Sequence, residues 1–186
     1  MLKDIFQSFL PWFAYFILAS YFDQHISIAI IAAAIITIAF DFKELRKGFI
    51  LSWGTFIYFI FLFIAAVVFK NPWVIKYHWL LSNSTLALIA WVSLLIRKPF
   101  TIQYAKEQVS SDKWQHPLFL KINNILTAVW GIIFFISVML NVSKIYLPEI
   151  SGTIYNISTY LPSIFGVWFT SWFSNWYREK YLAQLK

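Results

Sequence analysis

The sequence predicts an all-α protein that crosses a membrane several times. Three observations favour this class: 60% of the 186 residues are hydrophobic, only 12% are charged, and the hydrophobic residues gather into six long runs. A soluble domain carries about twice this share of charged residues, and a transmembrane helix needs roughly 20 consecutive apolar residues. The composition excludes a soluble enzyme domain and a disordered chain, and the absence of cysteine excludes a disulfide-stapled module.

The first two runs, 5–22 and 26–40, predict a pair of short helices joined by a tight turn. The first is rich in aromatic residues and contains Pro11, whereas the second consists mainly of Ile and Ala. At ~1.5 Å per residue the second run reaches only ~22 Å, less than the ~30 Å hydrocarbon core. Two interpretations stay open: both helices cross the membrane, or they form a hairpin that re-enters the cytosolic side.

Small residues recur every four positions in the second run, at Ala29, Ala33 and Thr37. Such a stripe lets another helix approach closely. It predicts either packing within the chain or a homodimer face.

Four further runs follow, over 49–69, 79–96, 120–140 and 154–176. The spacers between them contain charged and turn-forming residues, and the longest is 97–117. The four runs have the length that a membrane helix needs. Together with the first pair they predict about six transmembrane segments, of which four to six cross completely.

Lys and Arg residues are distributed unequally between the two sides of this topology. If all six runs cross, twelve of them lie on the side of the N-terminus, and only Lys70, Lys76 and Lys144 lie opposite. Cytosolic loops carry an excess of positive charge. The sequence therefore predicts that both chain ends face the cytosol. The net charge of +7 is interpreted as membrane-edge charge that faces anionic lipid headgroups, not as a nucleic-acid surface.

The central parts of the six runs contain no Asp, Glu, Lys, Arg or His. Coupled transporters usually keep an ionisable residue at membrane depth, so this absence weighs against them. Uncharged polar residues do cluster in the fourth and fifth runs. The residues are Ser82, Asn83, Thr85, Asn123, Asn124 and Thr127. They predict either a polar cavity for a small ligand or the interhelical hydrogen bonds that fix helix packing.

The spacer 97–117 predicts a short helix at the cytosolic membrane edge. Pro99 suits the first turn of a new helix, because its fixed φ and missing N–H cost nothing there. Within 100–109, Ile102, Ala105 and Val109 fall on one side of an amphipathic stretch. The stretch is interpreted as a connector at headgroup level or as a docking surface for a partner.

The sixth run carries two aromatic rows at four-residue spacing, which places each row on one helix face. The rows are Phe165, Phe169, Phe173 and Trp168, Trp172, Trp176. They predict a lipid-facing surface with an interfacial belt, or alternatively a site for a flat-ring ligand.

Four polar residues fall on the predicted outer side, namely Asp23, His25, His78 and Glu149. They are interpreted as solvated loop residues, with a metal site as the alternative. No phosphate-binding loop, nucleophile elbow or zinc-protease motif occurs, so the sequence predicts neither an enzyme nor a cofactor.

Several different short motifs follow one another along the chain in a characteristic order. They are Phe9-Leu10-Pro11, Phe69-Lys70-Asn71 followed by Val74 to His78, Arg97-Lys98-Pro99, and Lys121-Ile122-Asn123 followed by Ala128-Val129-Trp130. In this order they resemble the bacterial intracellular septation protein A family, although 100–117 and the C-terminal tail depart from it. The resemblance implies an inner-membrane protein linked to cell division and envelope shape. It carries over Lys98, Pro99, Asn123 and Trp130 as family-pattern residues, without assigned chemistry.

The sequence thus predicts one integral membrane domain over 1–186, with a cytosolic interfacial loop at 97–117 and a cytosolic tail at 177–186. The expected function is a non-enzymatic scaffold in cell division and envelope maintenance. Its expected partners are the lipid bilayer, division or wall-synthesis membrane proteins and further copies of itself. The alternative is a small passive channel or transporter for a small solute through the helix bundle.

Overall fold

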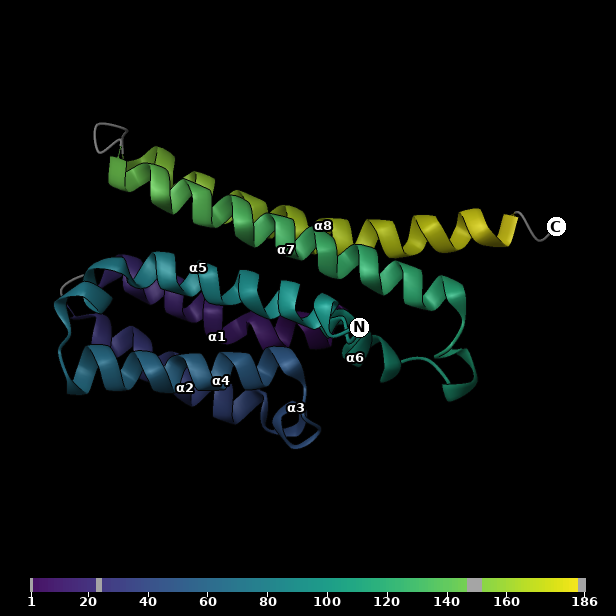
Figure 1. Cartoon of the computed structure of the whole chain (residues 1–186), viewed down its shortest axis with the longest axis horizontal. Coiled ribbons are helices and arrows are strands. Elements are labelled where there is room, and N and C mark those ends of the chain that lie inside the picture. Colours follow the sequence, from purple (N-terminus) through teal and green to yellow (C-terminus); the bar gives the residue numbers. More distant parts are fainter. Residues whose placement is uncertain (1, 23–24, 147–151, 184–186) are drawn as a thin grey trace. The chain divides into compact units, whose positions relative to one another are not determined.

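The computed structural model describes residues 2–22, 25–146 and 152–183, and all its regular elements are helical (Figure 1). Within these residues the chain forms eight α-helices, so the all-α prediction is confirmed. The chain divides into two compact units. One covers Lys3–Thr85, and the other covers Leu86–Lys186 together with the first two residues.

The unit Lys3–Thr85 contains four α-helices, one π-helical segment and the first part of a fifth α-helix. They are α1 (Leu2–Tyr21), α2 (Ile26–Phe40), α3 (Phe42–Arg46), α4 (Ile50–Leu62), η2 (Phe63–Val68) and the start of α5 (Pro72–Leu95). The segment η2 continues α4 directly, so Ile50–Val68 forms one helical stretch of 19 residues.

The small-residue stripe of α2 packs within this unit. Ala29, Ala33 and Thr37 are fully buried, and α2 contacts α4 and η2. Large aliphatic side chains such as Ile31 and Ile35 are exposed on the remaining surface of α2. Of the two interpretations of the stripe, the structure therefore shows packing within the chain.

The helix α5 begins seven residues earlier than the sequence analysis predicts. Asn71 caps it, because its Oδ1 accepts hydrogen bonds from the N–H groups of Trp73 at 3.0 Å and Val74 at 3.2 Å. Pro72 occupies the first helical position, where its missing N–H is harmless. The prediction that 70–78 is a spacer is therefore wrong, since only 69–71 separate η2 from α5.

The other unit contains the end of α5 and three further α-helices. They are α6 (Phe100–Lys106), α7 (Pro117–Tyr146) and α8 (Gly152–Ala183), with a 3-10 turn at Ser111–Lys113 between α6 and α7. Figure 1 shows α7 and α8 side by side, in agreement with their contacts. Within the predicted tail, residues 177–183 continue α8.

The predicted amphipathic stretch after Pro99 is a shorter helix than expected. Pro99 directly precedes the first residue of α6 and does not lie in its first turn. Five residues of α6 are buried, among them Phe100, Ile102 and Tyr104, and the helix contacts α7. Within this unit, α6 therefore packs against the membrane-type helix α7.

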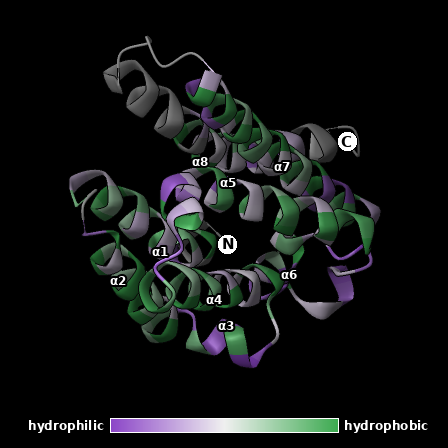
Figure 2. Ribbon diagram, turned by 60° about the vertical axis from the view of Figure 1, so that its left-hand side comes forward, coloured by the Kyte–Doolittle hydropathy of each residue, from purple (hydrophilic) through white to green (hydrophobic). Residues whose placement is uncertain are grey.

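Three helical stretches are long and apolar enough to cross a membrane: Ile50–Val68, Pro72–Leu95 and Pro117–Tyr146. Ile5–Tyr21 and Ile26–Phe40 are shorter apolar helices, as predicted. Figure 2 shows hydrophobic residues along the helices and hydrophilic residues around α3 and in the turns after α6. This pattern supports a multi-pass membrane protein. The sixth predicted run lies within α8.

Candidate functional site

A histidine is buried inside one of the membrane-type helices. His78 is the seventh residue of α5, about 9 Å along its axis, and its side chain is only 4% exposed. The prediction that His78 lies on an outer loop is wrong, because α5 begins at Pro72, is capped by Asn71 and therefore includes residue 78. An ionisable residue within a membrane helix is costly, and it marks a candidate functional site.

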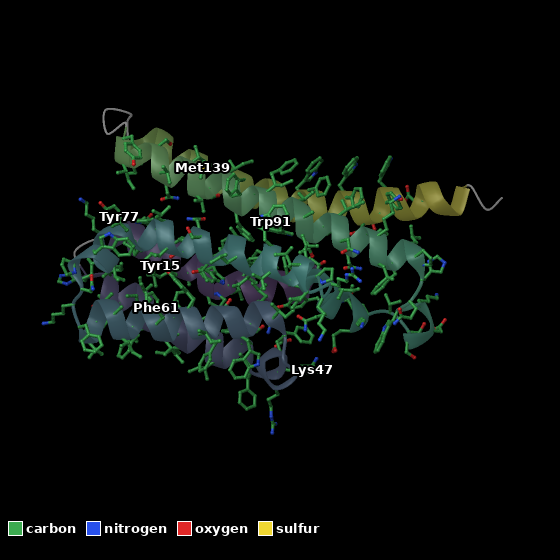
Figure 3. The ribbon with its side chains drawn as sticks, viewed as in Figure 1. Tyr15, Lys47, Phe61, Tyr77, Trp91 and Met139 are labelled. Carbon is green, nitrogen blue, oxygen red and sulfur yellow. The ribbon has the colours of Figure 1, made fainter. Side chains whose placement is uncertain are left out.

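The imidazole of His78 pairs with a phenol from α1. The hydroxyl of Tyr15 lies 2.7 Å from Nδ1 of His78, and the two rings meet edge to face. Tyr15 is fully buried, and Figure 3 shows it among the helices of its unit. When the phenol donates to Nδ1, the proton of the neutral imidazole lies on Nε2.

A second set of hydroxyl groups surrounds the backbone of His78. Ser82 donates to the carbonyl of His78 at 2.7 Å, and Tyr58 of α4 donates to the same carbonyl at 3.4 Å. The two hydroxyl oxygens lie 2.6 Å apart. The backbone of Tyr77, immediately before His78, is non-helical with φ −108° and ψ 18°. This kink directly precedes the residue whose imidazole contacts Tyr15 of α1.

Aromatic rings from α1 and α4 enclose this polar network. Trp12 stacks on Tyr58 with ring centroids 5.1 Å apart, and its indole N–H donates to Thr55 at 2.8 Å. Tyr15 packs edge to face against Phe59 at 5.4 Å. We call Tyr15, Tyr58, His78 and Ser82 the His78 network. Because imidazole and hydroxyl groups can each donate and accept hydrogen bonds, the network can relay a proton or bind a small polar solute.

The first three predicted polar residues all make hydrogen bonds in α5. Asn83 donates to the carbonyl of Trp79 at 3.0 Å, and Thr85 donates to the carbonyl of Leu81 at 2.9 Å. Only Ser82 of the three belongs to the His78 network. The sequence identifies Ser82 as a polar residue in an apolar run, but its partner Tyr58 lies on another helix, α4.

The second three polar residues lie in α7, in the unit Leu86–Lys186. Asn123 and Asn124 donate to carbonyl groups one turn earlier in α7, at 2.8 Å and 2.9 Å. The hydroxyl of Thr127 lies 2.8 Å from that of Thr101 in α6, which also donates to the carbonyl of Asn123 at 2.9 Å. The hydroxyl of Thr101 thus joins α6 to α7, and the sequence pattern did not indicate this residue.

The four family-pattern residues occupy different environments. Lys98 is exposed, and Pro99 is buried immediately before α6. Asn123 is buried in α7, as described above. Trp130 is buried between α7 and α8, where its indole N–H donates to Thr170 at 3.0 Å.

The proposed outer metal site is only partly within the described residues. Asp23 and Glu149 lie outside them, His25 is exposed, and His78 belongs to the network above. No group of three or more His, Asp or Glu residues within 2–22, 25–146 and 152–183 is placed to hold a metal ion.

The aromatic rows of α8 stack along the helix as their spacing predicts. Trp168 and Trp172 lie 5.6 Å apart with nearly parallel rings, as do Trp172 and Trp176. Phe169 and Phe173 stack at 5.1 Å. The three Trp side chains are exposed, as a lipid-facing belt requires.

No family model, curated protein or solved structure matches this chain. The resemblance to the septation protein A family therefore rests on the short motifs alone.

Proposed function

We propose that this chain is a non-enzymatic, multi-pass protein of the bacterial inner membrane that acts as a scaffold in cell division and envelope maintenance. One observation supports a scaffold over an open pathway: all six predicted cavity residues make hydrogen bonds within the protein. Five donate to a carbonyl one turn earlier, and Thr127 pairs with a hydroxyl of α6. A side chain that donates to a carbonyl of its own helix offers that donor to no solute, and the bond between Thr101 and Thr127 joins α6 to α7.

The exposed surfaces of the helices support lateral contacts with lipid and membrane proteins. Ile35 of α2 and Phe61 of α4 are large hydrophobic residues that remain exposed, as are the Trp residues of α8. The turn at Ser111–Lys113 adds an exposed polar surface next to α6. We assign partner binding to this turn and to the exposed face of α2.

Photo-crosslinking in living cells tests the scaffold. A photoreactive phenylalanine analogue replaces Ser111 in the turn or Ile35 on α2, and replaces Phe69, on the opposite predicted side, as control. The proposal expects adducts at positions 111 and 35 that mass spectrometry identifies as division or wall-synthesis membrane proteins. Adducts with lipid alone at both positions would contradict it.

The His78 network favours a second function, the passage of protons or a small solute. The side chain of His78 is an ionisable group buried in a helix of membrane-crossing length. Proteoliposomes with an internal pH dye and an imposed proton gradient test this function. Passage requires that the protein collapses the gradient faster than empty liposomes do, and that His78→Gln removes the effect. Equal rates for protein and empty liposomes would leave only the scaffold.

A further inference from the structure

Basic side chains gather in the unit Leu86–Lys186, where α5 ends, α6 follows and α7 begins. Between residues 97 and 121 five residues are basic and two are acidic, so this segment carries net positive charge. The basic residues are Arg97, Lys98, Lys106, Lys113 and Lys121, and the acidic ones are Glu107 and Asp112. Lys106 is half-buried and the other four basic residues are exposed.

A hydrogen-bonded turn at the end of α5 fixes the position of the first two basic residues. Arg97 has a φ of 57°, and its N–H donates to the carbonyl of Leu94 at 2.9 Å. The N–H of Lys98 donates to the carbonyl of Ser93 at 2.8 Å, which completes the Schellman motif of a helix end. The hydroxyl of Ser93 also accepts the N–H of Phe100 at 3.2 Å, so the same turn ties α5 to α6.

Lys106 and Lys121 each lie over an aromatic ring. The ammonium of Lys106 is 4.9 Å from the ring centroid of Trp114, whose indole N–H donates to the carbonyl of Val109 at 3.0 Å. The ammonium of Lys121 is 5.6 Å from the ring centroid of Tyr177 in α8. An aromatic ring attracts a cation without cancelling its charge, as a carboxylate would. Both ammonium groups are therefore positioned by a contact that leaves them positive.

Direct contacts join the elements that carry these residues. The hydroxyl of Thr101 in α6 bonds to the carbonyl of Asn123 in α7, shortly after Lys121. Lys121 in turn contacts Tyr177, which adds the last part of α8. Figure 2 shows the hydrophilic turns after α6 next to the hydrophobic helices of this unit. A change from apolar helix to basic and aromatic side chains is typical of the headgroup level of a membrane.

We propose that one basic surface of this unit binds the headgroups of anionic phospholipids. It consists of Arg97, Lys98, Lys106 and Lys121. A lysine keeps its charged end at headgroup level while its aliphatic stem lies along apolar surface, and tryptophan and tyrosine prefer the same depth. The positive charge complements that of the anionic headgroup. The proposal rests on the membrane location of the proposed function but not on the scaffold role, and it leaves the turn Ser111–Lys113 to protein partners.

Thermal unfolding of the purified full-length protein in an uncharged detergent tests this surface. Tryptophan fluorescence follows the Tm while phosphatidylglycerol or phosphatidylcholine is added in increasing mole fraction at low ionic strength. We expect the anionic phosphatidylglycerol to raise the Tm in a saturable way, and the zwitterionic phosphatidylcholine to raise it less. Molar NaCl should remove the difference between the two lipids, because salt screens exposed charges.

Two double variants separate this surface from the overall charge of the protein. Lys106→Gln/Lys121→Gln should raise the half-saturating mole fraction of phosphatidylglycerol roughly thirtyfold, which is about fivefold for each cation removed. Lys70→Gln/Lys76→Gln removes the same charge from the other unit, including the ammonium of Lys76 that lies 5.1 Å from the ring centroid of Tyr77. This control should keep the wild-type value.

Lys106→Arg/Lys121→Arg keeps both charges and should respond to phosphatidylglycerol as the wild type does. Equal responses of the wild type to the two lipids, or equal weakening in both glutamine variants, would overturn the surface. A Tm rise with inorganic phosphate as large as that with phosphatidylglycerol would overturn the assignment to a lipid. None of these outcomes affects the crosslinking test of the scaffold, so the two proposals fail separately.

Discussion

Asp41 ties the stability of the fold to pH. Burial raises the pKa of its carboxyl to about 6, Glu44 adds to the rise, and the hydroxyls of Ser8 and Ser52 act against it. The folded protein therefore binds the proton of this carboxyl more tightly than the unfolded chain does. The stability that this gives is complete below the unfolded-state pKa, near 3.8, and is lost as the pH rises through about 6.

We predict that the wild-type Tm falls between pH 4 and pH 7. The rise in pKa corresponds to at most about 3 kcal/mol in the free energy of unfolding. Asp41→Asn should flatten this part of the profile, because an amide does not ionise. Asp112→Asn, which changes an exposed carboxylate in the turn Ser111–Lys113, should keep the wild-type slope. Parallel profiles for Asp41→Asn and the wild type would show that Asp41 does not titrate there.

At the scale of helices, two kinds of contact hold the elements of each unit together. One is the hydrogen bond between rings of different helices, as between Tyr15 of α1 and His78 of α5. The other is close packing at a glycine, as where Gly166 of α8 meets Trp130 of α7. Each makes a prediction that a single substitution can test.

Tyr15→Phe should destabilise the unit Lys3–Thr85 by about 1–3 kcal/mol, because it leaves the buried Nδ1 of His78 without the phenol. The aromatic packing of residue 15 is preserved, so the loss reports the hydroxyl. Tyr146→Phe is the matched control, since Tyr146 is exposed near the end of α7. Denaturant unfolding in detergent measures both. Equal stability of the two variants would refute a structural role for this bond.

Gly166→Ala should separate α7 from α8. An added Cβ would lie 2.9 Å from the ring of Trp130 and 2.9 Å from Cδ1 of Ile133, so these side chains or the helices that carry them must shift. We expect a loss of about 1–3 kcal/mol, typical of an overpacked contact, in thermal unfolding. Ile164→Ala, two residues earlier on an exposed position of α8, should change stability much less. A Gly166→Ala protein as stable as the wild type would contradict this close approach.

The sequence predicts the helices of this fold better than their ends. Apolar runs identify helical segments because membrane helices must be continuously apolar. They underestimate the length of α5. This helix begins at Pro72 after its cap Asn71, so it includes the polar residues Lys76 and His78 that precede the apolar run. The Asn-Pro pair was the available signal. The π-helical segment Phe63–Val68 has no such signal, since it contains neither Pro nor Gly.

The His78 network could be predicted only in part. Ser82 is visible as a polar residue in an apolar run, but Tyr15 lies 63 positions from His78 and Tyr58 lies 24 positions from Ser82. Their meeting depends on how α1, α4 and α5 pack, which a helical pattern does not determine. Asp41 was unremarkable in the sequence for the same reason, because its burial results from three neighbouring helices.

For the whole molecule, the crossing number depends on α1 and α2. α2 has 15 residues and is shorter than a typical membrane helix, while Tyr21 and Phe22 at the end of α1 are exposed. If both helices cross, a cysteine at position 21 faces the outside. If they form a re-entrant hairpin, it faces the membrane interior or the cytosol.

The measurement that most directly tests the proposed multi-pass topology is cysteine accessibility in spheroplasts, because the natural chain has no cysteine. A membrane-impermeant maleimide is applied to Phe69→Cys, between η2 and α5, and to Ser111→Cys, between α6 and α7. With both chain ends in the cytosol, Phe69→Cys is labelled in intact spheroplasts and Ser111→Cys is labelled only after permeabilisation. Labelling of both before permeabilisation, or the reverse order, would contradict this topology.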